Sequence, residues 1–259
     1  RAHYNLGWSL PNHDPAALTA LETALRLRSN YLEAHFNLAN RLLHLARPAE
    51  ALFHFDESLR LKPGRPDIVH NRAQALAALG RIEEAIEQFE LVFRLSPTEA
   101  LGHVSLANIL AAQKRVPEAL EHYAMALRLE PDGLEANFNL GTVLLHQGRP
   151  ADALPHFETA VRVDPKTRSA LLNLGVACLQ LNRLPDAIRH FERVLELTPT
   201  DNRARNSLGL ALVAAGRRPD AAAQFLECLR LNPNDAFARE QLQQLQAPAP
   251  APAPAPSPR

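Results

Sequence analysis

The chain has 259 residues, of which 28 are lysine or arginine and 28 are aspartate or glutamate, so its formal net charge is zero. Proteins that bind duplex nucleic acid take most of their affinity from neutralised phosphates, and a membrane-binding polybasic patch needs a similar excess of cations. We therefore expect no nucleic-acid partner. The sequence contains no apolar run of about 18 residues, so we expect no direct membrane insertion by this chain.

One sequence pattern returns at a constant spacing of 34 residues between Leu32 and Asp235. Alanine marks one position of the pattern, namely Ala51, Ala85, Ala119, Ala153, Ala187 and Ala221. An aromatic residue follows four positions later, namely Phe55, Phe89, Tyr123, Phe157, Phe191 and Phe225. Proline closes each copy, namely Pro63, Pro97, Pro131, Pro165, Pro199 and Pro233. A period of this length predicts a solenoid, in which each repeat packs on its neighbours.

Each copy contains two segments with apolar residues three and four positions apart, which predicts two helices. Between them lies a residue type that accepts the left-handed conformation, namely Gly80, Gly148, Gly216 or Asn182. Proline is favourable in the first turn of the second helix, and the closing proline disfavours the helical conformation of the residue before it. The predicted fold class is therefore all-α, with six helix–turn–helix repeats over residues 32–235.

The two ends of the chain differ from the six regular copies. Residues 1–31 look like a degenerate or truncated copy, because the Asn-Leu-Gly sequence of residues 139–141 recurs there but two residues are missing between its halves. Since the chain begins with Arg1 and nothing caps that copy, we expect a fragment of a longer protein, with any self-association using this end. Residues 236–246 predict a polar capping helix, and the Ala-Pro alternation in residues 247–259 predicts an extended or disordered tail.

The pattern is most complete in one copy, through Leu140, Gly141, Leu144, Gly148, Ala153, Phe157, Ala160 and Pro165. It resembles the tetratricopeptide repeat, in full register over residues 32–235 and loosely over residues 1–31. The resemblance implies a right-handed superhelical solenoid of antiparallel helix pairs, whose first helices line a concave groove that binds peptides or partner helices. Two residues depart from the pattern, since Arg72 replaces a leucine and Pro155 lies inside a second helix.

One position of the first helices holds small polar side chains, although asparagine is unfavourable inside a helix. This asparagine row consists of Asn5, Asn37, Asn71, Ser105, Asn139, Asn173 and Ser207. An amide offers donors and an acceptor, so the row predicts sequence-independent pairing with the main chain of an extended peptide in the groove. A similar row lines the repeat arm of O-linked N-acetylglucosamine transferases. The alternative is that these amides form hydrogen bonds inside the solenoid.

Two neighbouring positions extend the predicted groove. One holds Phe36, His70 and Phe138, and the two phenylalanines are expected either to anchor an apolar side chain or to be partly buried between helices. The other holds Asn40 and Asn108. Repeats that clamp the acidic C-terminus of a chaperone use lysine and arginine at such positions. Because no lysine occurs here, the resemblance disfavours that class of partner.

Other recurring residues have structural interpretations. Six turn arginines, of which Arg47 is the first, each lie three residues before an acid and should pair with it between two helix ends. The recurring histidines are His54, His122, His156 and His190. They lie one repeat apart and cannot share a metal ion. Cys178 and Cys228 are expected to be buried and unpaired. The sequence shows no metal, cofactor or catalytic motif, so we expect no cofactor and no enzymatic activity.

The sequence therefore predicts a non-catalytic scaffold that holds an extended peptide or a partner helix of another protein in its groove. The alternative is the substrate-recruiting arm of a larger, glycosyltransferase-like enzyme whose catalytic domain is absent from this chain. The asparagine row, the start at Arg1 and the Ala-Pro tail motivate this alternative. The sequence decides neither the partner nor the compartment, although a cytoplasmic location is favoured.

Overall fold

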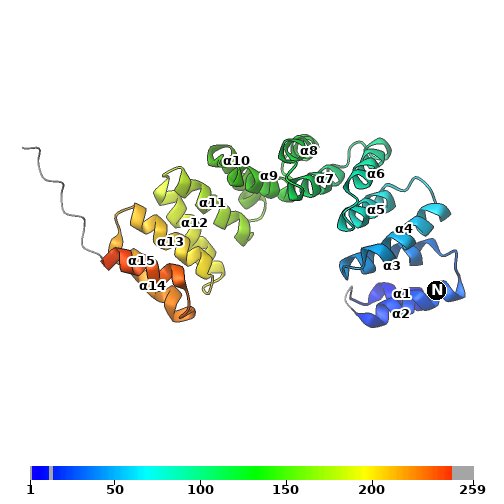
Figure 1. Cartoon of the computed structure of the whole chain (residues 1–259), viewed down its shortest axis with the longest axis horizontal. Helices are drawn as coiled ribbons and strands as arrows, with labels where there is room; N and C mark the ends of the chain where they lie inside the picture. Colours follow the sequence, from blue (N-terminus) through cyan, green and yellow to red (C-terminus); the bar gives the residue numbers. More distant parts are fainter. Residues whose placement is uncertain (1, 12–13, 247–259) are drawn as a thin grey trace, which may run out of the picture. The chain divides into compact units, whose positions relative to one another are not determined.

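The computed structural model describes residues 2–11 and 14–246, and every regular element in these residues is an α-helix (Figure 1). The chain divides into two compact units, residues 1–136 and 137–259. The boundary between the units lies within one helix, α9. The Ala-Pro tail predicted for residues 247–259 lies outside the described residues.

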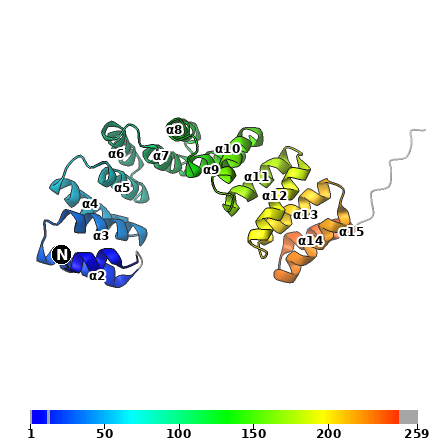
Figure 2. The ribbon, with the colours of Figure 1, turned by 180° about the vertical axis from the view of Figure 1, so that it is seen from behind.

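The first unit is built from α1 Ala2–Ser9, α2 Pro15–Leu27, α3 Leu32–His44, α4 Pro48–Leu61, α5 Pro66–Ala78, α6 Ile82–Leu95, α7 Ala100–Ala112, α8 Val116–Leu129 and the start of α9 Leu134–His146. Each helix from α1 to α7 packs against the next one. Short turns join them, so that the two helices of a repeat run antiparallel (Figures 1 and 2).

The second unit contains the rest of α9, followed by α10 Pro150–Val163, α11 Arg168–Gln180, α12 Leu184–Leu197, α13 Asn202–Ala214, α14 Arg218–Leu231 and α15 Ala236–Gln246. Each helix from α10 to α14 packs against the next one. The predicted all-α repeat solenoid is therefore confirmed. The division of the chain into a degenerate copy, six full repeats and a cap stays a prediction.

The turn inside each regular copy has the same backbone conformation. Its central residue has a φ between 55° and 76°, namely Ala46, Gly80, Lys114, Gly148, Asn182 and Gly216. The N–H of the residue that follows donates to a carbonyl oxygen in the last turn of the first helix. An example is Arg81, which donates to Leu76 at 2.9 Å. Glycine and asparagine were expected at this position. Ala46 and Lys114 adopt the conformation as well, although it is strained for them.

The recurring alanines and aromatic residues form the packed interior. All six alanines of the pattern are fully buried, and the six aromatic residues that follow them are at most 1% exposed. Cys178 and Cys228 are buried and unpaired, as expected. Pro155 does not break its helix, because α10 continues from Pro150 to Val163. Arg72 is half-buried in the middle of α5, where it forms an ion pair with Asp56 of α4 at 2.7 Å.

The turn arginines pair as predicted. The ion pairs are Arg47–Glu50, Arg81–Glu84, Arg115–Glu118, Arg149–Asp152, Arg183–Asp186 and Arg217–Asp220, at 2.6 to 2.8 Å. Each joins the turn to the first residues of the second helix, where an acid is favoured by the helix dipole. The arginines are therefore neutralised locally and form no basic edge.

Candidate functional site

The asparagine row lies on the first helix of each pair. Asn37, Asn71, Asn139, Asn173 and Ser207 are half-buried. Ser105 is buried, and its hydroxyl lies 3.3 Å from Nε2 of His70, which is also buried. These two predicted groove residues thus contact each other, and most of their surface is inaccessible to a ligand.

Two asparagines of the row form equivalent hydrogen bonds with the preceding repeat. Nδ2 of Asn71 donates to Oδ1 of Asn40 at 2.8 Å, and Nδ2 of Asn173 donates to Oγ1 of Thr142 at 3.2 Å. In both pairs the acceptor lies one helical turn after the asparagine position of its own helix, so the two bonds are equivalent in the repeat. The sequence left open whether these amides bond inside the solenoid, and one polar atom of each does.

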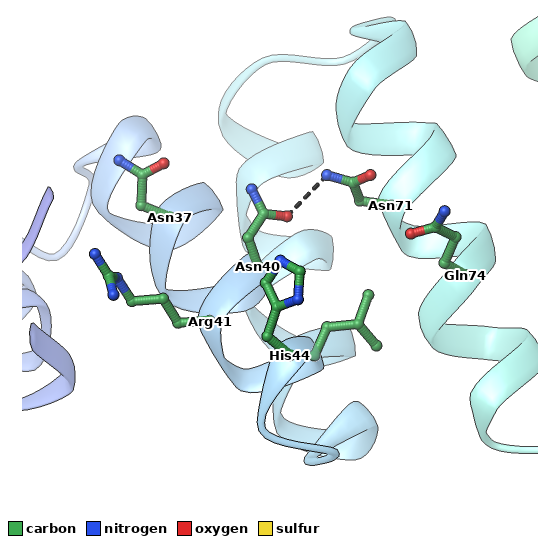
Figure 3. A pocket seen from close by; sticks show the side chains of 7 residues that line it. Asn37, Asn40, Arg41, His44, Asn71 and Gln74 are labelled. Carbon is green, nitrogen blue, oxygen red and sulfur yellow. Dashed lines mark hydrogen bonds between the residues drawn. The ribbon is translucent and has the colours of Figure 1, made fainter. Parts of the chain in front are cut away.

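A polar pocket of about 330 Å³ opens between α3 and α5 in the first unit. We call it the amide pocket, and its lining is Asn37, Asn40, Arg41, Leu43, His44, Asn71 and Gln74. Figure 3 shows the amides of Asn40 and Asn71 meeting across the space between the two helices. Three predicted groove residues are therefore brought together here, with Gln74 as a fourth amide.

The amides of this pocket keep polar atoms for a ligand. Asn37 uses its Nδ2 to donate to the hydroxyl of Tyr4 at 3.1 Å, and Nε2 of Gln74 lies 3.1 Å from Nε2 of His70. Within residues 2–11 and 14–246, no second hydrogen bond is formed by Nδ2 of Asn40 or by the side-chain oxygens of Asn37, Asn71 and Gln74. The pocket thus presents one amide donor and three amide acceptors.

Arg41 forms one wall of the amide pocket and was not singled out by the sequence. Its guanidinium donates to the carbonyl oxygens of Gly7, Leu10 and Pro11 at 2.6 to 2.7 Å. These carbonyls lie in the last turn of α1 and just after it, where helix-end acceptors lack intrahelical donors. Burial lowers the pKa of Arg41, which nevertheless remains a cation. The signal in the sequence was an arginine at a position that other copies fill with alanine, isoleucine or valine.

A second pocket, of about 410 Å³, adjoins the amide pocket through the shared residue Gln74. We call it the apolar pocket, and its apolar lining is Ala77, Ala78, Ile82, Leu101, Ile109 and Ala112. Asn108, at its rim, accepts a 2.5 Å hydrogen bond from the hydroxyl of Tyr123 and donates to Glu135 at 3.1 Å. Burial raises the pKa of Tyr123, so this hydroxyl keeps its proton.

The two predicted aromatic anchors are half-buried. The ring of Phe36 lies 6.3 Å from that of Phe55, and Phe138 lies at the same distance from Phe157. The guanidinium of Arg65 covers the Phe36 ring at 5.4 Å. Phe138 and Asn173 line a third pocket, in the second unit, together with Arg168 and Arg203.

Histidine pairs inside two repeats were missed from the sequence. Nδ1 of His35 lies 2.9 Å from Nδ1 of His54, and Nδ1 of His103 lies 3.0 Å from Nδ1 of His122. Burial, and then the neighbouring histidine, lower the pKa of both His54 and His103 to about 4. The signal was a spacing of 19 residues, which places the two rings on facing helices of one repeat.

The described residues hold no cluster of three or more histidine, cysteine, aspartate or glutamate side chains that could bind a metal ion. None of the helices in this part of the chain is both long and apolar enough to span a bilayer. The pockets therefore offer amides, guanidinium groups and apolar surface, which are groups that bind another molecule by non-covalent contacts.

Family models described as tetratricopeptide repeats match the chain over most of its length. One of them matches residues 15–66, 138–202 and 183–236, which together exceed half of the chain. Two further models match residues 98–166 and 42–109. The chain belongs to the tetratricopeptide repeat family. Comparison with curated protein sequences gave no match.

Solved structures show the same fold at low sequence identity. YrrB, described as a tetratricopeptide protein with an unusual peptide-binding site, superposes with a TM-score of 0.66 at 21% identity, covering 73% of this chain and 97% of YrrB. PilF of Pseudomonas aeruginosa gives 0.69 at 20% identity, covering 82% and 97%. The C-terminal part of a repeat protein from Cytophaga hutchinsonii gives 0.74 at 15% identity, covering 93% and 98%.

Tetratricopeptide repeats are generally non-catalytic scaffolds for protein interactions, and this chain has their fold. The similarity of the asparagine row to that of glycosyltransferase arms stays a prediction, as does the groove as a binding site.

Proposed function

We propose that the first helices of the first unit bind an extended segment of another protein, with its main chain on the amide pocket. The observation that carries this proposal is the convergence of Asn37, Asn40, Asn71 and Gln74 on one pocket between α3 and α5. Because the four amides are half-buried, their remaining polar atoms bond to water in the free protein and are accessible to a ligand. Here the pocket keeps one donor and three acceptors.

An extended main chain presents N–H and C=O groups in alternation, and its exposed groups need partners when they leave water. The amide pocket supplies both kinds of partner and carries no acid that would select a basic side chain. The adjoining apolar pocket, with Leu101 and Ile109, accommodates one apolar side chain of the same segment. The amide pocket then recognises the main chain of the segment, and the apolar pocket recognises one of its apolar side chains.

The family and one structural neighbour support this proposal. Tetratricopeptide repeats generally serve protein interaction, and YrrB is described as having a peptide-binding site. That description belongs to YrrB, and the residues that carry the proposal for this chain are its own amides.

The test is a peptide-library enrichment with the full chain, followed by fluorescence anisotropy on the enriched peptides. Asn37→Ala combined with Asn71→Ala is expected to weaken binding about tenfold or more, because each lost hydrogen bond contributes roughly 1 kcal/mol. Methylation of a main-chain nitrogen in the peptide should also abolish binding. Gln88→Ala removes an amide from α6, outside the pocket, and serves as the matched control.

Thermal melting separates binding from folding. The double variant should melt within a few degrees of the wild type, since its half-buried amides lie at a pocket rather than in the core. An absence of enriched peptides, unchanged affinity in the double variant, or a loss of affinity explained by unfolding would each overturn the proposal.

A further inference from the structure

The second unit contains a pocket of about 560 Å³ whose lining differs from that of the amide pocket. We call it the arginine pocket, and it is lined by Phe138, Thr142, His146, Arg168, Ser169, Leu172, Asn173, Thr198, Thr200, Asp201, Asn202 and Arg203. The residues come from α9, from the first turns of α11 and α13, and from the loop before α13. It combines two guanidinium groups with several hydroxyl groups and a small apolar surface.

One of the two guanidinium groups, that of Arg203, has no anionic partner, and the other, that of Arg168, has a distant one. Nη1 of Arg168 lies 3.6 Å from Oδ2 of Asp201, a distance that is long for a direct ion pair. The other oxygen of Asp201 accepts from the N–H of Ala204 at 3.0 Å and caps α13. Arg203 forms neither an ion pair nor a side-chain hydrogen bond with any residue in the described part of the chain. The pocket therefore carries a positive charge that the protein does not neutralise.

The positions of these arginines are unfavourable for helix stability. Arg168 is the first residue of α11 and Arg203 is the second residue of α13, where the helix dipole disfavours cations. The corresponding turns of α3, α5 and α9 carry the acids Glu33, Asp67 and Glu135. Arg203 therefore occupies the position that holds an acid in α3, α5 and α9, although Asp201 caps the same helix.

The surroundings of the guanidinium groups suit an anion. Hydroxyl groups of Ser169, Thr198 and Thr200 line the same pocket and can donate to an oxyanion. The helix dipole at the start of α11, which no side chain caps, adds positive potential to that of the side chains. Leu172 and Phe138 provide an apolar contact for the carbon atoms that carry the anionic group. The pocket and its two arginines, rather than a helix end alone, make this site.

We propose that the arginine pocket binds an acidic side chain of an extended protein segment, a carboxylate or a phosphoryl group being the ligand. The anion pairs with Arg203 and competes with Asp201 for Arg168. The proposal concerns a site in the second unit and goes beyond the amide pocket of the first unit.

The experiment is an NMR titration of the ¹⁵N-labelled full chain with capped hexapeptides. The probes have the sequence Gly-Ser-X-X-Ser-Gly, where X is glutamate, glutamine or phosphoserine. The glutamate peptide should shift the amide signals of residues 168–173 and 198–204 and bind about fivefold more tightly than the glutamine peptide. Raising the salt concentration from about 0.05 to 0.3 M should reduce this preference.

Two variants sharpen the result. Arg168→Gln combined with Arg203→Gln should bind the glutamate peptide as weakly as the glutamine peptide, and should melt at the same or a higher temperature because the helix starts lose cations. Gln88→Ala, outside both pockets, serves as the control and should leave the shifts of residues 168–173 and 198–204 unchanged. Because the readout is confined to these signals, failure of the amide pocket is distinguishable from failure of this site.

Tighter binding of the phosphoserine peptide than of the glutamate peptide would assign a phosphoryl ligand, and equal or weaker binding would assign a carboxylate. Equal affinity for the glutamate and glutamine peptides, shifts confined to other residues, or a lower melting temperature in the arginine variant would overturn the proposal.

Discussion

The two units of this molecule fill the same position of the repeat with different residues. Opposite the buried aromatic ring, the first unit has Ala39, Ala73 and Ala107, whereas the second has Gly141, Gly175 and Gly209. In the second unit the ring lies so near the backbone that a β-carbon at Gly175 would be only 2.5 Å from Cε1 of Phe191. In the first unit the alanines carry that carbon and are fully buried, so the rings there must stand farther from the helix. The residue opposite the ring and the distance of the ring from the helix are therefore coupled. Glycine occurs where the ring is close, and alanine where it is more distant.

The partners of the second-helix histidines differ between the units as well. The first unit pairs histidine with histidine twice, through His54 and through His122. In the second unit the residue facing His156 is Asn137, whose Oδ1 lies 3.0 Å from Nδ1 of the ring. The amide oxygen accepts a hydrogen bond from the ring N–H in either charge state of the ring, whereas two histidines at this distance can hold only one proton between their facing nitrogens without repulsion.

The largest expected effect is steric, in the second unit. Gly175→Ala should lower the free energy of unfolding by about 1–3 kcal/mol, because the added carbon overlaps the ring of Phe191 in a close-packed interior. Denaturant unfolding monitored by circular dichroism measures it. Adding Phe191→Leu should recover part of the loss, since the smaller side chain makes room for the new carbon.

The matched change in the first unit is Ala73→Gly. It removes a carbon instead of adding one, and should cost about 1 kcal/mol through weaker helix propensity. If Gly175→Ala stabilised the protein, as an alanine does at an unhindered helix position, the close approach of the ring in the second unit would be refuted.

The next effect is pH-dependent and belongs to the first unit. The pKa values of His54 and His103 are lowered to about 4, from an ordinary 6.5, by burial and by the neighbouring histidine. As the pH falls from 6.5 to 4, the unfolded chain takes up these protons before the folded one does. The stability contribution is therefore complete above pH 6.5 and is lost toward pH 4. Melting temperatures at about pH 7 and pH 5 should show the decrease.

A variant that introduces the asparagine partner found in the second unit tests whether the histidine pairs cause the loss of stability at low pH. His35→Asn combined with His103→Asn reproduces the Asn137–His156 arrangement in both repeats of the first unit. Its melting temperature should fall by less between pH 7 and pH 5 than that of the wild type. An equal loss would attribute the acid sensitivity to other groups, such as Glu50 and Glu57, which lie near His54.

The smallest expected effect concerns the turns, where the first unit again departs from the second. Ala46 and Lys114 have φ values of 55° and 61°, whereas the second unit uses Gly148, Asn182 and Gly216. Ala46→Gly and Lys114→Gly should each raise the free energy of unfolding by about 0.5–1 kcal/mol, because glycine adopts this conformation without strain. Thermal unfolding measures the gain, and Gly148→Ala should show the opposite sign. A loss of stability in both glycine variants would exclude the strain.

The period of 34 residues was enough to predict most of the fold. It placed the two helices of each repeat, because apolar spacing within a copy is helical and the turn and closing residues recur at fixed positions. It also identified the buried alanines and aromatics, such as Ala153 and Phe157, and the ion pairs of the turns. These features depend on residues close in the chain or at equivalent positions of successive repeats.

The site was less predictable because its chemistry depends on facing helices. The sequence indicated the asparagine row, but not that Asn71 donates to Asn40 while Gln74 completes the pocket. The pairing of His35 with His54 requires the register between two antiparallel helices. The charge of the arginine pocket depends on the space between the starts of α11 and α13, and a position-by-position reading does not show that space.

Arg41 makes α1 and α3 dependent on each other. The carbonyls of Gly7, Leu10 and Pro11, in the last turn of α1 and just after it, all accept hydrogen bonds from this one side chain. If residues 1–31 are a shortened copy of the repeat, as their sequence predicts, a homologue that keeps the short turn should keep the arginine, whereas one with a full-length first copy is free to place an apolar residue there. The length of the turn and the arginine should thus be inherited together, as a covarying pair that alignment of future relatives can display.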